Sequence, residues 1–137
     1  MRRLLPSLQA TEALAAELAA QVRPGDAILL DGPLGAGKSA FARAFLRSLT
    51  NDPALDVPSP TFTLVQTYDT PRGPVHHFDL WRLDGPAALE ELGWDDLTRD
   101  IVLVEWPDRL GHLTPDNALT IRLAHAGDDT REATLIR

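Results

Sequence analysis

The chain has 137 residues, and we expect residues 1–137 to form a single domain with a core of its own. It has no cysteine, which excludes a disulfide framework, a thiolate zinc site and a cysteine nucleophile. Thirteen basic residues against twenty acidic ones give a net charge of −7, which disfavours direct binding of nucleic acid, because that affinity depends on phosphate contacts. No apolar run exceeds four residues, which predicts a cytoplasmic protein with no membrane span and no secretory signal.

The first fifty residues predict two helices with a buried strand between them. Apolar side chains recur at every fourth position over 10–22 and again over 38–49, which is the spacing of an amphipathic helix. Ser7 or Thr11 can cap the first of these helices. Between the two helices, four apolar residues after a Pro-Gly-Asp turn predict the buried strand Ala27–Leu30.

The rest of the chain predicts mostly strands. They are expected at 62–68, 75–80, 101–104, 119–123 and 133–136, with one or two short acidic helices over 85–97. Helices that alternate with strands and hairpins in this way predict an α/β fold: a mixed sheet, parallel and antiparallel, with helices on its faces.

A glycine-rich segment lies between the first buried strand and the second helix. Residues 32–39, Gly-Pro-Leu-Gly-Ala-Gly-Lys-Ser, match the P-loop pattern G-x-x-x-x-G-K-[ST], in which backbone N–H groups surround a polyphosphate at a helix N-terminus. Lys38 would then contact the β- and γ-phosphates, and Ser39 would ligate Mg²⁺. Lys38 is the only lysine beside twelve arginines, which indicates a position that requires a slender ammonium. The alternative is a glycine-rich helix cap with a surface lysine.

Two acidic residues follow predicted strands and are candidates for the metal site. Glu105 ends the apolar run 101–104, and Asp79 ends a more polar strand. Carboxyl ends of strands in open α/β sheets carry the ligand site, so we expect Glu105 to bind the metal, and Asp79 to orient a water or to contact Mg²⁺ through a water ligand of the ion. The alternative for each is an acid that caps a turn.

Three further groups of residues are candidates for a role near these acids. His76 and His77 are adjacent on a strand and face opposite sides, so we expect one to be packed and the other exposed. Trp106 either lines the site, anchors a partner, or belongs to the core or to a lid. Thr61, in the Ser-Pro-Thr sequence of residues 59–61, is a candidate for contact with the γ-phosphate, although turn chemistry explains that segment equally well.

Five segments, taken together and in order, carry a more specific signal. They are residues 32–39, 59–65 (Ser-Pro-Thr-Phe-Thr-Leu-Val), 77–83 (His-Phe-Asp-Leu-Trp-Arg-Leu), 91–93 (Glu-Leu-Gly) and 104–107 (Val-Glu-Trp-Pro). In these segments the chain resembles the TsaE family, also called YjeE, the small bacterial ATPases of tRNA threonylcarbamoyladenosine synthesis. The resemblance extends from about Thr11 to Arg131.

This resemblance implies a P-loop NTPase-like three-layer fold, binding of ATP and Mg²⁺, and weak hydrolysis that partners stimulate. It implies docking onto the TsaB–TsaD pair, which modifies the adenosine beside the anticodon, so that tRNA is reached only through partners. By resemblance, the metal ligands are Ser39 and Glu105, the family's required aspartate is Asp79, and the nucleotide-binding residues are Thr11, Gly35, Ala36, Gly37, Lys38, Ser39 and Arg131. We add Ala40, which follows the phosphate loop, to the nucleotide-binding residues. Together with the residues discussed above, the expected catalytic residues are Lys38, Thr61, Asp79 and Glu105.

Two other functions remain open at this stage. A small-molecule kinase would share the phosphate loop, but it usually needs an arginine-bearing lid. A nucleotide-gated binding module would share every site residue and barely hydrolyse ATP. The acidic stretch 84–100 is either a docking face for a partner or a solvated surface.

Overall fold

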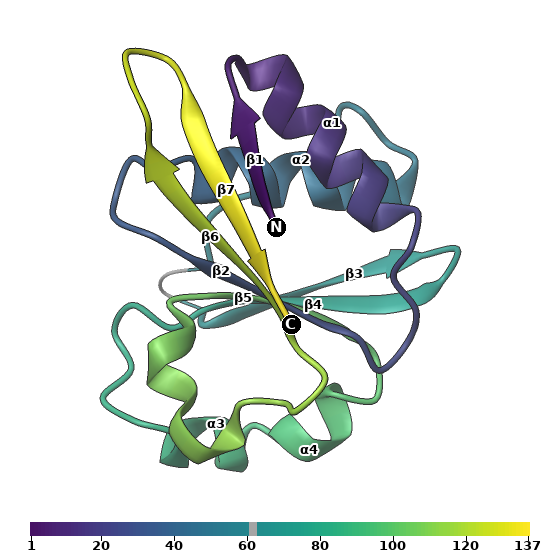
Figure 1. Cartoon of the computed structure of the whole chain (residues 1–137). Helices are drawn as coiled ribbons and strands as arrows, with labels where there is room; N and C mark the ends of the chain where they lie inside the picture. The colour runs from purple at the N-terminus through teal and green to yellow at the C-terminus, as the bar shows by residue number, and fades with distance from the viewer. Residues whose placement is uncertain (61–62) are drawn as a thin grey trace.

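A seven-stranded sheet forms the centre of the computed structural model, which describes residues 1–60 and 63–137. The strands lie in the order β1-β7-β6-β2-β5-β4-β3 (Figure 1). Their bounds are β1 Arg2–Leu5, β2 Ala27–Asp31, β3 Val65–Thr70, β4 Gly73–Asp79, β5 Ile101–Glu105, β6 Leu119–His125 and β7 Arg131–Ile136. The helices are α1 Leu8–Ala19, α2 Lys38–Thr50, α3 Ala87–Glu91, α4 Trp94–Leu97 and the 3₁₀ helix η1 Pro107–Leu113.

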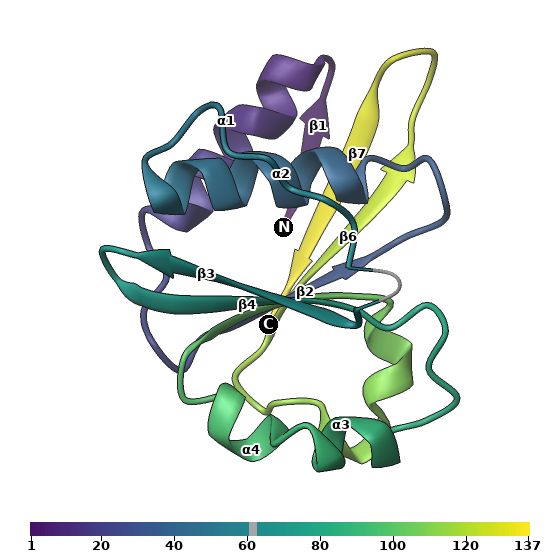
Figure 2. The same cartoon turned by 180° about the vertical axis from the view of Figure 1, so that it is seen from behind.

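The sheet is mixed, as the sequence predicts. Strands β6, β2, β5 and β4 run parallel to one another, and β3 and β7 are antiparallel to them at the two sides. Strand β1 pairs antiparallel with β7 and therefore runs in the same direction as the central strands. Helices α1 and α2 cover one face, and α3, α4 and η1 cover the other, an arrangement that both views show (Figures 1 and 2). The prediction of an α/β fold with three layers is therefore confirmed.

Two hydrophobic cores follow from the alternation of side chains along the central strands. Ile101 and Leu103 of β5 pack with α1 and α2, while Val102 and Val104 pack with Trp94 and the other residues of the opposite layer. Because β5 is buried on both faces, it consists of a continuous apolar run rather than an alternating one. Packing on both faces fixes the position of β5 in the sheet, and with it the position of the carboxyl end of the strand.

The predicted elements occur, with small shifts at their ends. Helix α1 begins after Ser7, whose hydroxyl accepts a hydrogen bond from the backbone N–H of Ala10 at 3.2 Å. It ends at Ala19 instead of residue 22. Strand β3 begins at Val65 instead of residue 62, because Leu64 has a left-handed φ of +71° that interrupts extended backbone. Phe62, the expected first residue, lies outside the described residues.

Strand β1 and helix η1 are not predicted from the sequence. The segment 2–5 is too short to show a period, and it becomes a strand by pairing with β7 more than a hundred residues away. Leu5 at its end is buried in the core under α1. Over the described part of the chain, no helix has the length and apolar character needed to cross a membrane.

Candidate nucleotide-binding site

The site lies where three parallel strands end at the same edge of the sheet. Strand β5 is paired with both neighbours, so that Glu105 lies opposite Leu30 of β2 on one side and opposite Asp79 of β4 on the other. The glycine-rich loop 32–37 leaves β2 at this edge and enters α2 at Lys38. The register of the parallel strands thus brings the loop and the two predicted acids together.

The backbone of the loop requires glycine at defined places. Gly35 and Gly37 have φ values of +79° and +102°, and Gly37 is the N-cap of α2, where the helix presents unpaired N–H groups. Gly32 has a φ of +141°, and a Cβ there would overlap the backbone carbonyl oxygen of Leu123 in β6. The loop can therefore lie close against β6 and still open toward an anion at the start of α2.

Ala36 differs from its neighbours in the loop. Its methyl group is fully buried in the core, and its N–H donates to the carbonyl of Pro33 at 3.2 Å. In this structure the backbone N–H of Ala36 is therefore engaged within the loop itself.

Lys38 is buried, with an exposed fraction of only 5%. Its Nζ lies 3.4 Å from the centroid of the Trp106 ring and makes no hydrogen bond to any described residue. Burial lowers the pKa of this ammonium, while the negative charges of Glu105, Asp31 and other nearby carboxylates oppose that change. A buried ammonium that contacts an aromatic face and makes no hydrogen bond to a described residue is poised to take an anionic oxygen.

A cavity of about 490 Å³ surrounds this lysine. Its lining comprises Leu34, Gly35, Gly37, Lys38, Ser39, Ala40, Ser59, Asp79, Trp81, Glu105 and Trp106. Hydroxyl, ammonium and carboxylate groups thus converge on one space at the N-terminus of α2. Predicted residues from three distant parts of the chain meet there.

Asp79 is buried at the end of β4, and both of its carboxylate oxygens are engaged. One accepts from the backbone N–H of Trp81 at 3.0 Å, which is the turn-capping arrangement that the sequence left open. The other accepts from the hydroxyl of Ser59 at 3.2 Å. Asp79 therefore ties Ser59 to the end of β4 and still lines the cavity. Thr61, expected beside it, lies outside the described residues.

Glu105 is buried at the end of β5 and is paired with a histidine. Its Oε2 lies 2.8 Å from Nε2 of His77, and both side chains are almost fully buried. The expectation that one of His76 and His77 is exposed is wrong: their exposed fractions are 5% and 2%. They do face opposite sides of the sheet, but both are buried because β4 lies between β5 and β3 and helices cover both faces of the sheet. Each bonds a carboxylate, His76 that of Asp100 at 2.8 Å.

The donors present fit a magnesium ion better than a metal held by protein alone. Across residues 1–60 and 63–137, no group of three or more His, Cys, Asp or Glu side chains could hold a metal ion. Mg²⁺ is commonly bound by one or two protein oxygens together with substrate phosphates and water. Ser39 and Glu105 in the same cavity supply oxygens of this kind.

Trp106 follows Glu105 directly and has the left-handed backbone angles φ +60° and ψ +55°. This turn directs its ring into the cavity, where it lies against Lys38 on one side and against Trp81 at a centroid distance of 4.5 Å. Trp81 is 45% exposed, as is expected of a side chain at the rim. Trp106 thus lines the site and also packs against the core on the α3–α4 side of the sheet, so two of the roles considered for it agree with the structure.

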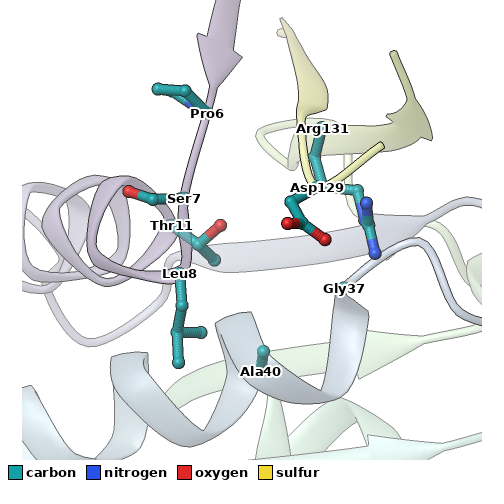
Figure 3. A pocket seen from close by; sticks show the side chains of 8 residues that line it. All are labelled: Pro6, Ser7, Leu8, Thr11, Gly37, Ala40, Asp129 and Arg131. Carbon is teal, nitrogen blue, oxygen red and sulfur yellow. The ribbon is translucent and has the colours of Figure 1, made fainter. Parts of the chain in front are cut away.

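A second cavity, of about 430 Å³, lies on the other side of the loop and shares Gly37 and Ala40 with the first. Figure 3 shows Thr11, Asp129 and Arg131 facing one another above the start of α2. Thr11 comes from α1, and the other two come from the β6–β7 hairpin. The two predicted residues, Thr11 and Arg131, are therefore placed together beside the phosphate loop.

Sequence reasoning missed two residues that line these cavities, Asp129 and Ser59, and the contact of His77 with Glu105 behind one of them. Asp129 lies in a polar hairpin loop that carries no periodicity, so no pattern marks it. The partner of His77 could not be inferred because it is 28 residues distant. Ser59 lay within a segment that the sequence singles out, and the residue before a proline is favoured in the extended form that it needs.

A buried strand, a phosphate loop and a helix, with acids at the ends of the adjacent parallel strands, define the P-loop NTPase-like class of α/β proteins. The structure has a TM-score of 0.80 with the crystal structure of YdiB from Bacillus subtilis, at 31% identity, over 98% of this chain and 83% of that one.

Sequence comparison gives the family. The family model described as threonylcarbamoyl adenosine biosynthesis protein TsaE matches residues 5–133, and the chain belongs to that family. It is 36% identical over 129 residues to the tRNA threonylcarbamoyladenosine biosynthesis protein TsaE of Rickettsia bellii, covering 93% of this chain and 89% of that protein. It is also 36% identical to the TsaE protein of Bacillus subtilis, covering 90% and 77%.

Proposed function

We propose that this protein is an ATPase of tRNA threonylcarbamoyladenosine synthesis that acts on the TsaB–TsaD complex. Membership of the TsaE family supports the place in that synthesis. The observation that carries the ATPase is the ammonium of Lys38, buried without a hydrogen bond to any described residue at the N-terminus of α2. Such a group is costly to bury unless an anion completes it.

The two adjoining cavities divide a nucleotide between them. The Lys38 cavity, at the helix N-terminus, takes the β- and γ-phosphates, because the ammonium and the helix N–H groups favour negative charge. The Thr11 cavity takes the nucleoside, and the guanidinium of Arg131 lies between the two regions in reach of an α-phosphate or ribose. The carboxylate of Asp129 would repel phosphate, which orients the neutral end of the nucleotide toward it.

Ser39 and Glu105 are the residues that would hold Mg²⁺. When bound, the ion neutralises charge on the β- and γ-phosphates. Asp79 contributes by holding Ser59 and the Trp81 turn, which shapes the wall opposite the loop. Any water that these residues orient lies against a carboxylate that is already engaged twice, so we expect the protein alone to hydrolyse ATP slowly.

Partner stimulation follows from the charge of the site. None of the described residues that line the Lys38 cavity is an arginine, so Lys38 is the one cation among them to face the β- and γ-phosphates. Transferred phosphoryl groups are usually stabilised by an additional positive charge, which in many P-loop enzymes comes from a partner. We expect TsaB–TsaD to complete the site in this way.

The test is steady-state phosphate release from Mg·ATP by the protein alone, with TsaB–TsaD, and with tRNA added to the complex. We expect stimulation of at least about tenfold by the pair, on the scale of a supplied cation. Tight nucleotide binding without stimulation would overturn the ATPase and favour the nucleotide-gated module. The kinase gains no support from the fold, since the last described elements are strands β6 and β7 and not a lid helix.

A further inference from the structure

The contact between His77 and Glu105 points to a role for His77 at the proposed metal site, and this inference rests on the proposed function. His77 and Glu105 lie on neighbouring parallel strands, with Asp79 opposite Glu105 in the register. Side chains two residues apart on a strand share a face, so His77, Asp79 and Glu105 all lie on the face covered by α2. The imidazole is therefore directly behind the acid that lines the phosphate cavity.

The surroundings of the two ring nitrogens of His77 indicate which group donates the hydrogen bond to the other, His77 or Glu105. Nε2 lies 2.8 Å from Oε2 of Glu105, while Nδ1 is buried and has no partner among the described residues. A proton on Nδ1 would leave a buried donor without an acceptor, which is the more costly arrangement. His77 thus carries its proton on Nε2 and donates it to the carboxylate.

We infer that His77 is a positioning residue that holds Glu105 in the orientation needed for Mg²⁺. It engages Oε2, and among the described residues Oε1 has no hydrogen bond, so that oxygen is left for the ion or its water. A histidine behind a ligating carboxylate fixes the rotamer and saturates the oxygen that faces away from the metal. Of the two adjacent histidines, His77 is therefore the one that acts on the metal site.

His76 provides an internal control on the same strand. It is buried to a similar degree and also bonds a carboxylate, that of Asp100, at the same distance of 2.8 Å. It faces the opposite side of the sheet, and Asp100 precedes β5 instead of ending it. A purely structural role for a buried histidine–carboxylate pair predicts similar effects at both positions, whereas positioning of the metal ligand predicts an effect at His77 alone.

The experiment measures Mn²⁺ binding to the full chain by electron paramagnetic resonance, with the protein saturated by ADP, and separately measures ADP affinity in EDTA. We expect His77→Leu to weaken Mn²⁺ binding about 10- to 100-fold, as is typical when an outer-shell partner is lost. Its ADP affinity in EDTA should stay within about twofold of wild type, because the loop and Lys38 are unchanged. His76→Leu should leave both quantities at the wild-type level.

Two conservative variants keep the test decisive if His77→Leu folds poorly. The amide nitrogen of His77→Gln reaches the position of Nε2, and His77→Asn is polar but too short to reach Glu105. We expect Gln to restore Mn²⁺ binding to within about threefold of wild type and Asn to remain as weak as Leu.

Three outcomes would overturn the inference: unchanged Mn²⁺ binding in His77→Leu, an equal loss of ADP affinity in EDTA, or Gln and Asn variants that behave alike. Failure of the proposed function looks different. Wild-type protein that binds ADP and Mn²⁺ but hydrolyses no ATP with TsaB–TsaD contradicts the ATPase and leaves the role of His77 in metal binding intact.

Discussion

The residue with the most unusual environment is Lys38, because lysine side chains are rarely buried without an ionic partner. Its ammonium lies against the Trp106 ring and makes no hydrogen bond within the described residues. Nearby carboxylates at the ends of β4 and β5 compensate part of the charge without contacting it. The site therefore retains a desolvated positive charge that nucleotide binding can relieve.

This predicts opposite effects of Lys38→Met on binding and on stability. The variant keeps the aliphatic stem and removes the charge, so we expect nucleotide affinity to fall about 10- to 100-fold, the value of a charge-assisted hydrogen bond. The thermal midpoint without nucleotide should equal that of wild type or exceed it. Calorimetry with and without Mg·ATP measures both, and a variant that melts well below wild type would show that the ammonium has a stabilising partner.

Tyr68 offers a second residue-scale prediction, on the dependence of stability on pH. Its hydroxyl is buried, and burial raises the pKa of the phenol. Above pH 10 the unfolded chain loses this proton before the folded one does, so the stability linked to Tyr68 is present below pH 10 and is lost as the pH rises through the raised pKa. Wild type should therefore lose more stability between pH 9 and 11 than Tyr68→Phe.

The same variant should be at least as stable as wild type at pH 7, by up to about 1 kcal/mol, because the lost hydroxyl has no partner among the described residues. Urea unfolding at the two pH values tests both statements. Parallel pH profiles for the two proteins would contradict the effect of burial on the phenol.

At the scale of elements, the contact between the phosphate loop and strand β6 carries the site. Gly32 is packed so closely against Leu123 that a Cβ would overlap the carbonyl oxygen of that strand. The loop is thereby seated on the sheet before it turns into α2. A substitution here moves the loop and not only a side chain.

We expect Gly32→Ala to cost about 2–4 kcal/mol of stability, from overlap together with left-handed strain. Gly73→Ala is the matched control, since Gly73 also has a positive φ of +102° but has open space around its Cβ position. That variant should cost about 1 kcal/mol, the strain alone. Urea unfolding measures both losses of stability. If Gly32→Ala and Gly73→Ala lose the same free energy of unfolding, the backbone around Leu123 accommodates the added Cβ at no cost and the prediction is wrong.

The three layers show why some elements are predictable and others are not. Helix α2 and strand β2 carry their own signals, a repeat of apolar residues and an unbroken apolar run, and both occur within two residues of their expected bounds. Strand β1 has no such signal, because only its pairing with β7 makes segment 2–5 extended. The hydrophobic pattern of a segment reflects which of its own side chains are buried. It does not show which distant segment will pair with it in the sheet.

For the whole molecule, the net charge of −7 decides which partner the protein can engage alone. The acidic side chains at 90, 91, 95 and 96 are exposed on the α3–α4 side, on the face away from α1 and α2. We therefore expect no binding of tRNA by the isolated protein below roughly 100 μM, since binding to nucleic acid needs a basic surface. Filter binding at low salt tests this, and retention of tRNA by the protein alone would contradict the indirect role proposed for it.

The sequence by itself determined the P-loop pattern and, through it, the class of chemistry that we propose. The loop 32–39 needs only neighbouring residues to surround an anion, so the proposed role follows from eight consecutive residues. The placement of Glu105 and Asp79 at strand ends was equally visible, because each follows its own strand.

Only the tertiary structure decided which groups meet. The register of β4 against β5 set Asp79 opposite Glu105 and brought His77 to the carboxylate, and the left-handed turn at Trp106 put its ring on Lys38. These contacts join residues that are distant in the chain, through strand pairing and packing across the whole sheet. No local pattern encodes such a contact, because its energy belongs to the assembled fold.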